Sequence, residues 1–95
     1  MTKGGVYNLE DRTVKFSEEI IIFVKSLNRD VVNNPLINQL VKSATSVGAN
    51  YCEANGASSR KDFKNKIFIC KKEAKETKYW LQVIAKANPE KIDQC

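Results

Sequence analysis

The chain has 95 residues and a mass of 10.7 kDa, which is enough for one small domain. Its 16 Lys and Arg against 11 Asp and Glu give a net charge of +5, and none of its residues is His. Without His, a Ser-His-Asp or Cys-His catalytic site cannot be built from this chain alone. Pro and Gly are few, which disfavours a multi-turn β-sandwich. Composition therefore predicts a small basic helical domain that needs a partner surface. The sequence also shows no acid–base pair, phosphate-binding loop or metal-ligand cluster, so we expect a protein that is not an enzyme and binds no cofactor.

The three cysteines, Cys52, Cys70 and Cys95, form neither a CxxC motif nor a tight cluster. We expect reduced thiols, with Cys52 and Cys70 as small apolar fillers of helices and Cys95 exposed. No apolar run is long enough to cross a membrane, and the first five residues lack the features of a signal peptide. These observations predict a cytoplasmic protein without membrane contact.

Residues 1–8 contain two Gly and no periodic pattern, so we expect a flexible lead-in there and a single helical domain over residues 9–95. Apolar residues then recur at steps of three and four, which is typical of one face of a helix. This spacing predicts a first helix over about residues 9–28.

The second helix is predicted over about residues 35–55, with Asn34 as its N-cap and Pro35 as its first helical residue. Gly56 is expected to end it. Gly48 lies inside this helix, where glycine costs about 1 kcal/mol relative to alanine. Close approach of another helix would explain a glycine at that position.

The third helix is predicted over residues 59–87, where Ser59 and Asp62 form a start that resembles a capping box. Seven residues then alternate at steps of four and three, as in a coiled-coil seam: Phe63, Ile67, Cys70, Ala74, Thr77, Leu81 and Ile84. A second stripe runs beside this seam through Ile69, Glu73, Glu76, Trp80 and Val83. Two stripes predict two neighbouring partners, as in an oligomer of bundles.

Pro89 resembles the first residue of a fourth helix, but only six residues follow it, barely a turn and a half. The fold class predicted from these elements is all-α: an antiparallel up-and-down helical bundle with three long helices and the start of a fourth. Either a fourth helix is missing from this chain or a partner takes its place. We therefore expect a homo-oligomer.

Several blocks of the sequence share a family pattern: LEDRTVKF over 9–16, KSATSVGANYCEAN over 42–55, SRKDF over 59–63 and KKEAKETKYWL over 71–81. Over about residues 9–85 the chain resembles the four-helix bundle protein family, also called 23S rRNA intervening-sequence proteins. The resemblance implies an up-and-down bundle that assembles as a pentamer. Related proteins include the accessory variability protein of diversity-generating retroelements, which binds a reverse transcriptase and nucleic acid through a basic surface. The family defines no catalytic residues.

Basic residues concentrate on one face of the predicted third helix. This candidate nucleic-acid-binding set is interrupted only by Phe68 and consists of Arg60, Lys61, Lys64, Lys71, Lys75 and Lys78. A lysine stripe about 25 Å long can follow the phosphate backbone of RNA or DNA with little base specificity. The alternative is that these side chains only solubilise the helix, some of them paired with acids four residues away.

A second set of residues is predicted to lie at helix or subunit interfaces: Ser46, Gly48, Asn50, Glu53, Glu73, Glu76, Tyr79 and Trp80. Ser46, Asn50 and Glu53 would form hydrogen bonds between helices or protomers. The three glutamates are expected to pair with Lys42, Lys72 or Arg60 rather than bind metal, because no His completes a di-metal motif. Tyr79 and Trp80 would fill an interface with their polar atoms at its rim, which is favoured over base stacking.

Two functional hypotheses follow from these patterns. The first is a non-enzymatic oligomeric protein that binds nucleic acid, or a nucleic-acid enzyme such as a reverse transcriptase, through the third helix. The second is a protein–protein interaction module that does not bind nucleic acid.

Overall fold

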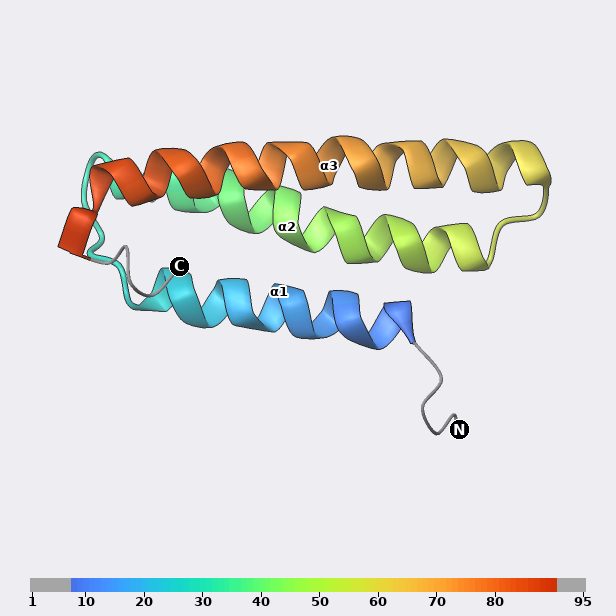
Figure 1. Ribbon diagram of the computed structural model, residues 1–95, viewed down its shortest axis with the longest axis horizontal. Coiled ribbons are helices and arrows are strands. Elements are labelled where there is room, and N and C mark those ends of the chain that lie inside the picture. The colour runs from blue at the N-terminus through green and yellow to red at the C-terminus, as the bar shows by residue number, and fades with distance from the viewer. Residues whose placement is uncertain (1–7, 91–95) are drawn as a thin grey trace.

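The computed structural model describes residues 8–90, which form three α-helices and no strand (Figure 1). These are α1 (Leu9–Lys25), α2 (Asn33–Asn55) and α3 (Arg60–Ala87), and successive helices run in opposite directions. The predicted all-α class is thus confirmed. Pro89 and Glu90 have 3₁₀ geometry, and the rest of the predicted fourth helix lies outside the described residues, as does the predicted lead-in up to residue 7.

The central helix is α2, because it packs against both α1 and α3, whereas α1 and α3 scarcely touch. The molecule is accordingly wider than it is thick, with extents of 43 × 30 × 16 Å. The three helices therefore form an open layer, in which α1 and α3 each keep a flank that no other part of residues 8–90 covers.

Side-chain caps explain where α1 and α3 begin. Asn8 Oδ1 accepts a hydrogen bond from the backbone N–H of Asp11 at 3.2 Å, so Asn8 is the N-cap of α1 and not part of a patternless lead-in. Ser59 Oγ accepts one from the N–H of Asp62 at 3.0 Å, as the capping pattern predicts. Each cap satisfies an N–H group that has no partner inside the helix.

The predicted start of α2 is wrong by two residues. Asp30 Oδ1 accepts hydrogen bonds from the N–H groups of Val32 at 3.0 Å and Asn33 at 2.7 Å, so the helix begins at Asn33. Asn34, the predicted cap, instead accepts a hydrogen bond from Arg29 Nε at 3.2 Å. Pro35 still fits in the first turn, where its missing N–H would have had no intrahelical partner.

The end of the first helix differs from expectation, whereas the end of the second agrees with it. Tight hydrogen bonds from the N–H groups of Ser26 and Leu27 to carbonyls three residues back end α1 at Lys25, before the predicted end at residue 28. Helix α2 ends at Asn55, and Gly56 has φ −100°. This φ lies outside the left-handed region, so the end of α2 does not require a glycine.

The apolar core lies toward the end of the layer where α1 connects to α2. Seven buried residues form it, and Leu40, Ala44 and Ile84 are 0% exposed. The cluster comprises Ile20, Val24, Leu27, Ile37, Leu40, Ala44 and Ile84. We call this half of the layer, residues 20–40 with 77–88, the loop end, and residues 9–17 with 48–70 the far end.

A buried amide pair joins the start of α2 to the end of α3 at the loop end. Asn33 Nδ2 donates to Asn88 Oδ1 at 2.9 Å, and Asn88 Nδ2 donates back to Asn33 Oδ1 at 2.9 Å. The second hydrogens go to the carbonyl oxygens of Asn28 and Ile84, each at 2.9 Å. Both amides are thus hydrogen-bonded through donor and acceptor, as burial of polar groups requires.

Gly48 allows the close approach of α1 and α2 that its position predicts. A Cβ atom placed on Gly48 would lie 3.0 Å from Thr13 Oγ1 and 3.1 Å from Thr13 Cβ. These distances are shorter than ordinary van der Waals contacts between carbon atoms. An alanine at this position would therefore require Thr13 to shift by a few tenths of an ångström.

The predicted coiled-coil seam of α3 is buried only in part. Thr77 and Ile84 are buried, but Phe63 is 42% exposed and Ala74 is also exposed. The seam residues are less covered toward the far end, because α1 packs on α2 and scarcely touches α3 within residues 8–90.

Candidate nucleic-acid interface

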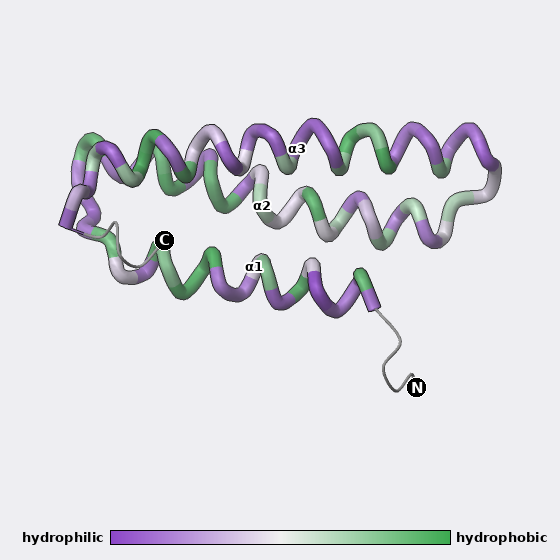
Figure 2. The backbone as a smooth tube through the Cα atoms, in the orientation of Figure 1, coloured by the Kyte–Doolittle hydropathy of each residue, from purple (hydrophilic) through white to green (hydrophobic). Residues whose placement is uncertain are grey.

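The basic residues of α3 share one exposed face, which we call the basic face: Arg60, Lys61, Lys64, Lys71, Lys75 and Lys78. At about 100° of rotation per residue, these six positions lie within an arc of about 100° around the helix. All six side chains are exposed. Figure 2 shows the hydrophilic stretches along α3 that contain them.

The charge of the chain is concentrated on this helix. Helix α3 carries nine Lys or Arg and three Asp or Glu, a net charge of +6, which exceeds the +5 of the whole chain. Its acids, Asp62, Glu73 and Glu76, lie at least about 60° outside the arc of the basic face. Within residues 8–90 no carboxylate forms an ion pair with the basic face. The positive charges therefore face solvent without neutralisation by neighbouring side chains.

Two exposed aromatic side chains accompany the lysines. Phe68 lies within the arc of the basic face and is 69% exposed, and Tyr79 lies at its edge and is 56% exposed. The Tyr79 ring packs edge-on against Trp80, with centroids 4.8 Å apart and an angle of 77° between the planes. Trp80 itself is half-buried and packs against the core, so it anchors the neighbouring tyrosine ring.

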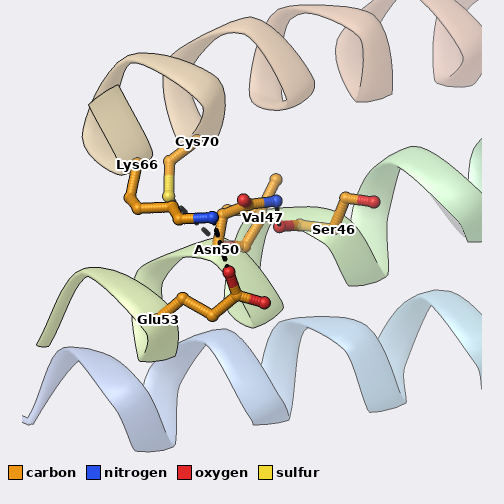
Figure 3. Close-up of polar contacts among 6 residues, drawn as sticks. All are labelled: Ser46, Val47, Asn50, Glu53, Lys66 and Cys70. Carbon is orange, nitrogen blue, oxygen red and sulfur yellow. Dashed lines mark hydrogen bonds and ion pairs between the residues drawn. The ribbon is translucent and has the colours of Figure 1, made fainter. Parts of the chain in front are cut away.

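On the opposite side of α3, polar contacts connect it to α2 near the far end (Figure 3). Lys66 Nζ lies 2.7 Å from Glu53 Oε1, and Cys70 Sγ donates to the carbonyl oxygen of Val47 at 3.4 Å. Nearer the loop end, Thr77 Oγ1 donates to Ser43 Oγ at 3.1 Å. These contacts fix the register of α2 against α3.

Two of these contacts involve groups with shifted pKa values. The hydrogen bond from Lys66 to Glu53, and then the attraction between their charges, raise the pKa of the Lys66 ammonium. Partial burial raises the pKa of the Cys70 thiol, because burial disfavours the charged thiolate. Cys70 therefore fills space as predicted for a structural cysteine, whereas Cys52 is exposed and the prediction that it is a filler is wrong.

The predicted interface residues are distributed unevenly. Asn50 Nδ2 donates to the carbonyl of Ser46 at 2.9 Å (Figure 3). Ser46 Oγ donates to the carbonyl of Lys42 at 2.8 Å, so both bonds stay within α2. Among Ser46, Asn50 and Glu53, it is Glu53 that bonds to another described helix. Its partner is Lys66 rather than the predicted Lys42, Lys72 or Arg60.

The two glutamates of the second stripe of α3 differ in exposure. Glu73 is half-buried and Glu76 is exposed, and neither forms an ion pair with another described residue. The pairing predicted for these two glutamates is therefore absent from residues 8–90.

One surface feature was missed by the sequence patterns. An open apolar groove of about 740 Å³, here called the end groove, is lined mainly by Val31, Val32, Pro35, Leu36, Tyr79 and Val83. Val31 is 88% exposed and Val32 is 54% exposed. The signal for this groove was two adjacent valines that follow the polar residues 28–30 in the connection.

Other kinds of site find little support in the described residues. Within residues 8–90, no three His, Cys, Asp or Glu side chains gather closely enough to hold a metal ion. None of the helices in this part of the chain has the length and apolar character needed to span a bilayer.

Comparison with known proteins places these features in a family context. The family model described as 23S rRNA-intervening sequence protein matches residues 8–92. A similar solved structure is the 1.70 Å crystal structure of a protein with unknown function from the S23 ribosomal protein family of Bacteroides thetaiotaomicron VPI-5482. It is 35% identical to this chain, with a TM-score of 0.76, and the match covers 92% of this chain and 81% of that one. No curated protein matches the sequence significantly.

Proposed function

Because this chain belongs to the 23S rRNA-intervening sequence protein family, we propose that it is a non-enzymatic, homo-oligomeric protein that binds RNA or DNA through the basic face. The observation that carries this proposal is a helix with a net charge of +6 whose basic face is exposed and contains no carboxylate. The family's description refers to ribosomal RNA, and the solved relative belongs to a ribosomal protein family, which agrees with a nucleic-acid partner.

Binding of this kind is dominated by release of counterions from phosphates and depends strongly on salt. For four lysine–phosphate contacts on a single strand, affinity falls about 100-fold between about 50 and about 300 mM salt. A homo-oligomer would present several basic faces and strengthen each weak contact through avidity. The same face would suit an accessory role beside a reverse transcriptase or another nucleic-acid enzyme.

The test is fluorescence anisotropy with a labelled oligonucleotide and two variants of equal net charge. One replaces Lys64, Lys71, Lys75 and Lys78 with Glu. The control replaces Lys15, Lys25, Arg29 and Lys42 with Glu, which are also exposed but lie outside α3. We expect the first variant to lose binding and the control to retain most of it. Equal losses in both, or no binding by the wild type to any polynucleotide at low salt, would refute the proposal.

Self-association is supported by exposed apolar side chains on α1. Ile22 is 69% exposed and Val14 is 52% exposed, and Val14 and Ile21 line a groove of about 340 Å³ between α1 and α2. The pentamer implied by the family resemblance would bury such surfaces. Light scattering should give a mass several times 10.7 kDa that falls in the Val14→Glu/Ile22→Glu variant. A monomeric wild type would overturn this part of the proposal.

The end groove favours a second candidate function, that of a protein–protein interaction module. Its exposed valines would receive an apolar segment of a protein partner. Under this alternative, a dominant partner would stay bound after nuclease treatment at high salt and would be lost in the Val31→Asp/Val32→Asp variant. The charge-reversal variant of the basic face would retain that partner.

A further inference from the structure

Phe68 is an apolar ring on the basic face of α3. Its 69% exposure compares with 36% for Phe16 and 42% for Phe63. On the surface of a helix, the nearest neighbours of a residue lie three and four positions away. For Phe68 three of these four neighbours are Lys64, Lys71 and Lys72, and all three are exposed.

The fold within residues 8–90 makes no use of this ring. Phe68 belongs neither to the core cluster nor to the apolar side chains that pack against it. It lies about 160° around α3 from the buried Ile84, so it cannot turn toward α2. If the basic face served only to keep the helix soluble, a polar residue would be favoured at position 68. That role therefore does not account for an exposed phenylalanine there.

Tyr79 provides a second exposed ring along the same arc, three helical turns from Phe68. Eleven residues separate the two positions, which corresponds to about 16 Å along the helix axis. That distance equals the rise of about five stacked nucleotides in a strand. Lys71, Lys75 and Lys78 lie between the rings, and the contact with Trp80 holds the Tyr79 ring in place.

We propose that Phe68, assisted by Tyr79, stacks on unpaired bases, so that the basic face selects single-stranded nucleic acid over duplex. This inference rests on the proposed function and names the class of nucleic acid bound. Lysines bind the phosphates of either form, but an aromatic ring gains a stacking partner only when bases are unpaired. Alternation of cations with exposed rings is the arrangement that sequence-tolerant single-strand binding requires.

The test compares the full chain with Phe68→Ala, using labelled oligo-U RNA, oligo-dT and a duplex of the same length. Loss of one stacking contact is expected to weaken single-strand binding about 10-fold. Duplex affinity and the salt dependence of binding should not change, because no lysine is lost. Phe68→Trp should restore single-strand affinity, and the circular dichroism of all variants should match the wild type. The two single strands distinguish an RNA from a DNA ligand.

The matched control is Phe63→Ala, which removes the same ring from an exposed position on another side of α3 and should leave binding unchanged. A strand containing 2-aminopurine gives an independent readout, since stacking on Phe68 would change its fluorescence in the wild type and not in Phe68→Ala. If the wild type binds single strands and duplex equally and Phe68→Ala has no effect, stacking is refuted while the proposed function stands. If the wild type binds no polynucleotide, both fail. A protein partner that resists nuclease and requires Phe68 would also overturn the stacking role.

Discussion

The loop end and the far end of the helical layer are held together by different kinds of contact. At the loop end lie most of the apolar core and the Asn33–Asn88 amide pair. At the far end the contacts include the approach of Thr13 to Gly48 and exposed polar pairs, such as Glu53 with Lys66 and Asn55 with Glu10, and Ala54 is a buried apolar residue outside the core cluster. Stability is therefore concentrated at one end, and Phe68 and half of the basic face lie where changes cost the fold little.

The largest expected effect is the loss of Leu40 from the loop end. Leu40 is 0% exposed, so Leu40→Ala leaves a cavity and should lower the free energy of unfolding by about 2–5 kcal/mol. The far-end control, Phe63→Ala, removes a ring that is 42% exposed and should cost about 1–2 kcal/mol. Urea unfolding followed by circular dichroism measures both. Equal losses would contradict the division between the two ends.

The next effect concerns the buried amides. Asn88→Ala leaves the Asn33 side chain buried without its partner and should cost about 1–3 kcal/mol in urea unfolding. The double variant Asn33→Leu/Asn88→Leu should cost less than the sum of the losses in Asn33→Leu and Asn88→Leu. The reason is that the double variant leaves neither amide side chain buried without its partner. Additive losses would show that the two side chains are not coupled.

A smaller effect on stability is expected from replacing the two far-end glycines, Gly48 and Gly56, with alanine, and the two replacements should differ. Gly48→Ala should lower stability by about 1 kcal/mol, because contact with Thr13 outweighs the gain in helix propensity. Gly56→Ala should be neutral or stabilising by less than about 1 kcal/mol, since the nearest atom to the new Cβ is 3.9 Å away and the backbone needs no glycine. Thermal unfolding of the two variants checks the order, and a Gly48→Ala protein more stable than Gly56→Ala would contradict it.

The smallest effect belongs to the Glu53–Lys66 pair, which solvent screens because Glu53 is exposed. Glu53→Gln should return the raised pKa of Lys66 to its ordinary range, as measured by NMR titration of the lysine. Folding raises this pKa, so the pair contributes fully to the free energy of unfolding at any pH below the ordinary lysine pKa. That contribution disappears as the pH rises through the raised pKa of Lys66. Stability at neutral pH should barely change, and a large loss there would show that the far end depends on this pair.

Sequence patterns predicted the parts of the fold that depend on neighbours along the chain. The Ser59 cap is a contact across three residues, and the side of α3 that faces solvent follows from its own periodicity. The start of α2 was missed because Asp30 acts from upstream of the more conspicuous Asn34-Pro35 pair. Both positions carry capping chemistry, and only the geometry of the connection decides between them.

The remaining errors concern contacts between helices. The far half of the α3 seam is open because of how α1 sits on α2, which no pattern within α3 encodes. Glu53 pairs with Lys66 because α2 and α3 meet in one particular register, and several lysines were equivalent partners beforehand. The basic face and the place of Phe68 within it were both visible as spacing, and the structure adds that this ring is 69% exposed.

The amide pair between Asn33 and Asn88 has a practical consequence for measurements on this molecule. Neither side chain titrates or carries a charge, and both are buried, so changes in pH or ionic strength act on this contact only weakly. The loop end therefore serves as a fixed reference during a salt titration. A loss of bound nucleic acid on adding salt then reports weakened contacts with phosphate rather than separation of α2 from α3.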